Sequence, residues 1–88
     1  STADKSYTKS LYEGGAERIG AKITEEAGEL ARAIAAETDE RVVSEAADLL
    51  FHAMVGLRSR GVPMRDVFAE IARRMGTSGH DEKRARGK

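Results

Sequence analysis

Residues 16–37 read AERIGAKITEEAGELARAIAAE and contain the clearest periodic pattern of the chain. Its apolar positions recur at spacings of three or four residues, the period of a helix with one buried stripe. The stripe consists of Ile19, Ile23, Ala27, Leu30 and Ile34. We therefore predict a long helix over residues 16–37. Before it, a polar lead-in over residues 1–6 and a short helix over residues 7–13 are expected, with a stop or kink at Gly14 and Gly15.

Two further helices are predicted after this stretch. Thr38 and Asp39 supply an N-cap for a second helix that runs to about residue 60. A third helix is expected over residues 64–75, closed by a C-cap at Gly76. Because the loop before it is short, we expect this third helix to turn back against the first two.

The apolar face of the second helix is wider than one neighbouring helix would cover, so a second packing surface is expected. The predicted fold class is therefore all-α: an antiparallel helical hairpin plus a packing helix, completing a helical bundle by homodimerisation.

Length, charge and composition limit the classes of function that the chain can have. The chain has 88 residues, enough for one domain over residues 1–88, in which the polar tail 77–88 is expected to be flexible. Its 15 basic and 15 acidic residues give a net charge of zero, which argues against a nucleic-acid partner. No apolar run is long enough to span a membrane, so no membrane partner is expected. Cysteine is absent, which excludes thiolate catalysis and fits a cytoplasmic location.

Two acidic pairs form the informative cluster of the sequence. On a helix that advances about 100° per residue, Glu26 and Glu29 share a strip beside the apolar stripe, whereas Glu25 points away from the core. On the second helix, Glu45 and Asp48 share a similar strip. Antiparallel helices joined by a tight turn bring positions equidistant from that turn together. The sequence therefore predicts that the two pairs meet.

Four converging carboxylates repel one another unless a cation lies between them. Oxygen ligands without cysteine favour Mg²⁺, or alternatively Mn²⁺, over zinc. The predicted metal ligands are Glu26, Glu29, Glu45 and Asp48. The competing interpretation is that these acids form the solvated faces of helices, since Glu is a favoured helix former.

The acidic pattern and its flanks resemble a known family. The sequence is similar to the phosphoribosyl-ATP pyrophosphohydrolases of histidine biosynthesis, within the all-α NTP pyrophosphohydrolase superfamily. The superfamily pattern Glu-Glu-x-x-Glu, then Glu-x-x-Asp on the next helix, is matched by Glu25, Glu26, Glu29, Glu45 and Asp48. The narrower assignment rests on Ser6-Tyr7-Thr8, on the run 47–52, and on Ser78-Gly79, Glu82-Lys83 and Arg86 in the tail. The resemblance implies a further helix before Ser6, and we expect this chain to lack it.

The resemblance implies Mg²⁺-dependent hydrolysis of phosphoribosyl-ATP to phosphoribosyl-AMP and pyrophosphate. In that reaction Glu25 or Glu26 is the candidate general base, and the sequence leaves the choice open. The candidate substrate-binding residues are Lys22, His52, Arg74, Lys83 and Arg86. Each assignment has an alternative. Lys22 could form an ordinary ion pair with an acid on the same helix, and His52 could hydrogen-bond only to backbone or solvent. The basic residues of the tail could simply be solvated.

Two other functions stay open at this stage. One is a housecleaning pyrophosphohydrolase of the same fold that acts on deoxynucleoside or non-standard triphosphates. The other is a non-catalytic helical interaction module whose acidic strips are only surface. The expected partners are phosphoribosyl-ATP, a second copy of the chain, and the phosphoribosyl-AMP cyclohydrolase of the next step.

Overall fold

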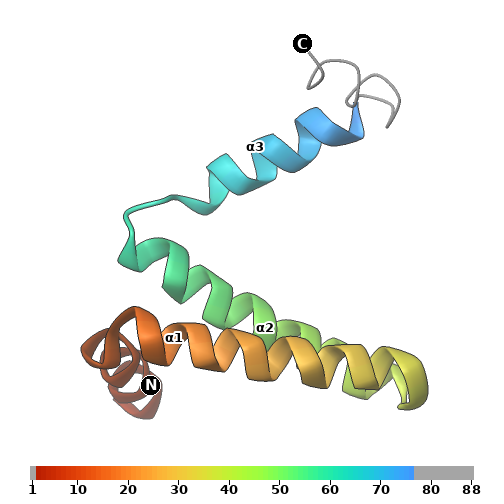
Figure 1. The fold of residues 1–88 in the computed structure, drawn as a ribbon, viewed down its shortest axis with the longest axis horizontal. Helices are drawn as coiled ribbons and strands as arrows, with labels where there is room; N and C mark the ends of the chain where they lie inside the picture. The colour runs from red at the N-terminus through yellow and green to blue at the C-terminus, as the bar shows by residue number, and fades with distance from the viewer. Residues whose placement is uncertain (1, 77–88) are drawn as a thin grey trace.

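The computed structural model describes residues 2–76, with side chains from residue 5 onward. It contains three helices: α1 (Thr2–Ala36), α2 (Asp39–Ser59) and α3 (Met64–Met75). Residues 2–76 contain no strand, so the all-α prediction is confirmed. In Figure 1, α2 runs back along α1, and α3 leaves this pair after a short loop. No helix in the described part of the chain is long and apolar enough to cross a membrane.

The first helix begins earlier than the sequence predicts. A polar lead-in was expected up to residue 6, but the helix starts at Thr2 and leaves helical geometry only at Gly15. This residue has φ 71° and ψ −167°, a conformation that essentially only glycine adopts. The expected kink is therefore confirmed. The lead-in prediction is wrong because hydrophobic periodicity gives no signal in a polar segment that is nevertheless helical.

The contact between α1 and α2 contains a small apolar core. Leu11, Ile19 and Val55 are buried together, and Tyr7 and Ile23 pack against them. The helices approach closely at Gly56, where an added Cβ would lie 3.2 Å from Cγ2 of Ile19. The kink contributes to this core because it brings Leu11, which lies before Gly15, into the same cluster.

The predicted caps at the start of α2 and at the end of α3 are confirmed. The Thr38 side chain accepts a hydrogen bond from the backbone N–H of Arg41 at 3.3 Å, which starts α2. After α2 the chain turns through Gly61 at φ 72°, and α3 ends at Gly76. The tight turn at Thr38 sets the register in which α1 and α2 face each other.

The third helix does not pack as expected. None of its residues is buried, and in Figure 1 it points away from the pair formed by α1 and α2. Pro63 enters the helix in an extended conformation, with φ −77° and ψ 147°, and directs it outward. Its apolar side chains are left uncovered: Phe68 is 61% exposed and Met75 82%.

Replacement of Gly15 by Ala tests the role of the kink. We expect Gly15→Ala to lower the free energy of unfolding by about 1–3 kcal/mol because alanine is strained in this backbone conformation. No atom lies within 4 Å of the added Cβ, so a steric clash does not contribute. The matched control is Gly20→Ala, which also meets no atom within 4 Å and should stabilise the helix by about 0.5–1 kcal/mol. Urea unfolding measures both, and equal effects would contradict this account.

Candidate metal centre

Three carboxylates from two helices meet between α1 and α2. Glu26 and Glu29 extend from α1 and Glu45 extends from α2. One oxygen atom from each carboxylate can be chosen so that all three lie within 4.8 Å of one another. The structure thus brings together three of the four predicted metal ligands.

Two of these carboxylates are buried and only half paired. Glu26 is 6% exposed and Glu45 is 3% exposed. One oxygen of each faces a basic residue four positions earlier, Lys22 for Glu26 and Arg41 for Glu45. The other oxygen, Oε2 in both residues, is buried and has no hydrogen-bond partner among the described residues. A buried acceptor without a partner is costly, and a cation between the carboxylates would remove that cost.

The surroundings of Glu45 disfavour its charged form. Its pKa is raised above the ordinary value, first by a hydrogen bond with the carboxyl group of Glu29, next by burial, and then by the negative charge of Glu29. The negative charge of Asp48 raises this pKa further, whereas Arg41 lowers it. Carboxylates whose negative charges oppose one another favour a site for a proton or a metal ion.

Asp48 lies at the edge of this cluster. It is exposed, and it is not among the three residues whose oxygens converge. Its side chain is one methylene shorter than that of glutamate, and its position on α2 is about 60° around the helix from Glu45. The role of Asp48 as a metal ligand stays a prediction.

Glu25 and Lys22 lie on the solvent side of the cluster. The Glu25 side chain is 53% exposed, and its Oε2 accepts a hydrogen bond from Lys22 Nζ at 3.2 Å. The same Nζ lies 3.7 Å from Oε1 of Glu26. The hydrogen bond to Glu25 is the main cause of a raised pKa for Lys22. Lys22 therefore stays charged beside the carboxylates, and a role for it toward phosphate is untested.

His52 is buried behind Asp48, and it does not bond to the Asp48 carboxylate. Its Nδ1 lies 2.8 Å from the backbone carbonyl oxygen of Asp48, and its Nε2 lies 2.6 Å from the hydroxyl of Tyr7. Only 5% of His52 is exposed. Contact of this ring with a substrate stays a prediction.

Sequence reasoning missed two residues of this region. Arg41 contacts Glu45 and also donates to Glu37 from Nε at 3.3 Å. Its four-residue spacing from both acids was the available signal. Tyr7 was noted only as part of a family motif, and no spacing rule connects it to a residue 45 positions away.

Of the predicted phosphate-binding residues near the C-terminus, only Arg74 belongs to the part of the chain that the structure describes. Arg74 lies at the end of α3, where its Nε donates to Oε2 of Glu70 at 2.9 Å. Lys83 and Arg86 lie outside the described residues. Whether these three side chains bind substrate stays a prediction.

The ion pairs of Glu70 with two arginines on α3 predict how the helicity of α3 depends on pH. Hydrogen bonds from Arg73 and then Arg74 lower its pKa from 4.5 to about 2. A lowered carboxyl pKa contributes stability above pH 4.5, and this contribution is lost as the pH falls through about 2. We therefore expect Glu70→Gln to be less helical than the wild type at neutral pH by circular dichroism. The difference should vanish between pH 4.5 and 2, and a difference independent of pH would contradict the assignment.

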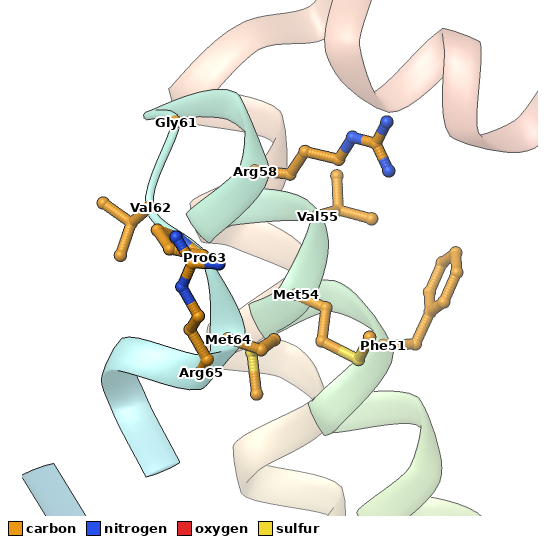
Figure 2. A pocket seen from close by; sticks show the side chains of 9 residues that line it. All are labelled: Phe51, Met54, Val55, Arg58, Gly61, Val62, Pro63, Met64 and Arg65. Atoms are coloured by element: carbon orange, nitrogen blue, oxygen red, sulfur yellow. The ribbon is translucent and has the colours of Figure 1, made fainter. Parts of the chain in front are cut away.

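An open, mostly apolar groove of about 610 Å³ lies where α2 meets the loop before α3 (Figure 2). Its lining includes Phe51, Met54 and Val55 from α2 and Val62, Pro63 and Met64 from the loop and the start of α3. None of the converging carboxylates lines it. The groove and the acidic cluster are therefore separate features.

Comparison with known proteins gives consistent matches. The family model described as phosphoribosyl-ATP pyrophosphohydrolase matches residues 1–75. The phosphoribosyl-ATP pyrophosphatase of Rhodopirellula baltica is 53% identical over 85 residues, which cover 92% of this chain and 70% of the relative. The phosphoribosyl-ATP pyrophosphatase of Rhizorhabdus wittichii is 51% identical over 83 residues, covering 94% and 78%.

A third relative is the histidine biosynthesis bifunctional protein of Wolinella succinogenes, which is 48% identical over 81 residues. The match covers 92% of this chain and 35% of that protein. No solved structure matches the chain.

Proposed function

Because the chain belongs to the phosphoribosyl-ATP pyrophosphohydrolase family, we propose that it hydrolyses phosphoribosyl-ATP to phosphoribosyl-AMP and pyrophosphate in histidine biosynthesis. The structural observation that carries this proposal is the convergence of three carboxylates, two of them buried with an unpaired oxygen. Such a cluster suits a divalent cation, and a substrate with a triphosphate needs one to offset its charge.

Mg²⁺ is the proposed metal, and Mn²⁺ is an alternative with the same ligand chemistry. Glu26, Glu29 and Glu45 would hold it through carboxylate oxygens, with Asp48 as the fourth candidate ligand. The two buried oxygens without partners support this fit, and all ligands are hard oxygen donors. The bound ion would neutralise the diphosphate that leaves and polarise the phosphorus that is attacked.

The residues around the cluster have distinct tasks in this proposal. Glu26, whose carboxylate is buried in the cluster, is the proposed metal ligand, and Glu25, which Lys22 links to Glu26, is the proposed general base. Lys22, between these two acids, offers its charge to a phosphate oxygen. Arg74, Lys83 and Arg86 are proposed for the ribose-linked phosphate of the substrate, where guanidinium groups can bind in a bidentate manner.

We also propose a homodimer as the working form. Exposed apolar side chains support the dimer. They include Phe68 and Met75 on α3 and Leu50 on α2, which is 56% exposed. A second copy can cover these faces by completing a helical bundle. The apolar groove of Figure 2 adds further exposed apolar side chains, among them Phe51 and Met54.

A link to the next enzyme of the pathway is a further part of the proposal. The Wolinella relative is named as a bifunctional histidine biosynthesis protein, so in that protein a domain like this one occurs with a second activity. The phosphoribosyl-AMP cyclohydrolase, which would consume the product, is the partner we propose. A cytoplasmic location also stays a prediction.

Pyrophosphate release with competing substrates tests the proposed function. With Mg²⁺ present, we expect release from phosphoribosyl-ATP to exceed release from dCTP at equal concentrations. Glu29→Gln should remove the activity. A preference for dCTP or a damaged nucleotide would support the housecleaning alternative. Release from neither substrate, with no effect of Mg²⁺ on the melting temperature, would support the non-catalytic alternative.

A further inference from the structure

The kink in α1 brings Tyr7 against α2, close to the acidic cluster. Gly15 redirects the first part of the helix, so that Tyr7 packs on the buried cluster that contains Leu11 and Val55. Its hydroxyl oxygen lies 2.6 Å from Nε2 of His52, although 45 positions separate the two residues. This hydrogen bond joins the segment before the kink to the helix that carries Glu45.

The partners of His52 determine the direction of its hydrogen bonds. Its Nδ1 lies 2.8 Å from the backbone carbonyl oxygen of Asp48, which can only accept. Nδ1 therefore donates to this carbonyl, and when the ring carries a single proton Nε2 is an acceptor. It follows that the hydroxyl of Tyr7 donates to Nε2. A directed chain of hydrogen bonds runs from Tyr7 through His52 to the backbone of Asp48.

Ring packing holds the aromatic groups independently of the hydroxyl. The rings of Tyr7 and Phe51 stack with centroids 6.2 Å apart and planes 23° apart. The ring of His52 meets each of them edge to face, at 5.8 Å from Tyr7 and 5.3 Å from Phe51. Phenylalanine at position 7 would keep these contacts, so the hydroxyl can be tested alone.

The hydrogen-bonded chain ends beside the proposed metal ligands. His52 lies one helical turn from Asp48 and two turns from Glu45 on the same side of α2. Through its hydrogen bond to His52, Tyr7 links the part of α1 before the kink to the side of α2 that carries Glu45 and Asp48.

We propose that Tyr7 is a positioning residue of the carboxylate site, which orients His52 by hydrogen bonding and so holds the Asp48 turn of α2 in register with α1. The inference rests on the proposed function, because it assumes that the carboxylates bind a metal. Hydrogen-bond partners one step removed from metal ligands typically contribute 10- to 100-fold to metal affinity or activity. Tyr7 is one hydrogen bond further from Asp48 than His52 is, so we expect an effect at the lower end of this range, about tenfold.

The test compares Tyr7→Phe with Tyr12→Phe, which removes the same hydroxyl from an exposed tyrosine on the same segment. In the full chain, Tyr7→Phe should lower kcat for phosphoribosyl-ATP about tenfold at saturating Mg²⁺, with KM changed less than about twofold. Mn²⁺ affinity, measured by electron paramagnetic resonance without substrate, should fall about tenfold. Nitrogen-15 NMR should show the Nδ1–H form of His52 in both proteins, because the Asp48 carbonyl still accepts from Nδ1. The Nε2 resonance should shift in Tyr7→Phe, because the hydrogen bond from the Tyr7 hydroxyl is lost.

A double variant separates positioning from general stability. If Tyr7 acts through His52, Tyr7→Phe combined with His52→Asn should be no less active than His52→Asn alone. Additive losses would overturn the inference, as would a Tyr7→Phe variant that equals Tyr12→Phe in kcat and Mn²⁺ affinity. An inactive wild type would refute the proposed function. The Mn²⁺ affinities of the same variants would then still decide for or against Tyr7.

Discussion

Replacing Glu45 by Gln is expected to lower Mg²⁺-dependent pyrophosphate release by more than about a hundredfold. Residues that only hydrogen-bond to metal ligands contribute 10- to 100-fold to metal affinity or activity. Glu45 is proposed as a ligand itself, so its loss should have a larger effect. The carboxylate is 3% exposed and its Oε2 has no partner among the described residues. Steady-state kinetics on the purified variant measure the loss.

Without metal, Glu45→Gln should be at least as stable as the wild type. The raised pKa of Glu45, caused first by Glu29 and then by burial, means that folding disfavours its charged form. A neutral glutamine removes this repulsion, so the melting temperature of metal-free Glu45→Gln should equal or exceed that of the wild type. Mg²⁺ should raise the melting temperature of the wild type but not of the variant.

Glu17→Gln is the matched control for Glu45→Gln because Glu17 is an exposed glutamate on α1, outside the acidic cluster. It should retain full activity and the full response to Mg²⁺. A Glu45→Gln enzyme of normal activity would contradict the metal site. A variant that unfolds without metal would show that Glu45 has a structural role instead.

The second large effect is expected at the proposed dimer interface. Phe68→Glu should shift the dimer toward monomers by at least about a hundredfold in dissociation constant. Burying a Phe side chain stabilises by about 1.5–3 kcal/mol, and a symmetric dimer contains two copies. Phe68 is 61% exposed in one chain, so its substitution should leave the fold of α1 and α2 intact. Sedimentation velocity over a range of concentrations measures the equilibrium.

The control for this substitution is Ala69→Glu, because Ala69 is an exposed residue about 100° further around α3, away from the apolar stripe. It should leave the dimer unchanged. A wild-type protein that stays monomeric at all concentrations would contradict the homodimer proposal. A Phe68→Glu protein that stays dimeric would place the interface on another face.

The helices were predictable where local chemistry sets their ends. Thr38 caps α2 and Gly76 closes α3, as their residue types indicate. The start of α1 at Thr2 was not predictable, because its first turns are polar and have no apolar period. The direction of α3 was missed as well. Loop length shows that a helix must turn, but the backbone angles at Gly61 and Pro63 decide where it points.

The candidate site was predictable to the extent that it depends on helical spacing. The angle around the helix separated buried Glu26 from exposed Glu25, and the tight turn at Thr38 brought Glu45 opposite Glu26 and Glu29. The partners of His52 could not be predicted. Its contact with Tyr7 depends on the angle of the kink at Gly15, which the presence of a glycine permits but does not specify.

Titration with Mn²⁺, monitored by electron paramagnetic resonance, tests whether Glu26, Glu29 and Glu45 form a metal site. We expect saturable binding to the wild type and to Glu17→Gln, and at least about a hundredfold weaker binding to Glu26→Gln. Mg²⁺ should compete for the site. Equal binding by Glu26→Gln and the wild type, or no binding by either, would contradict the claim.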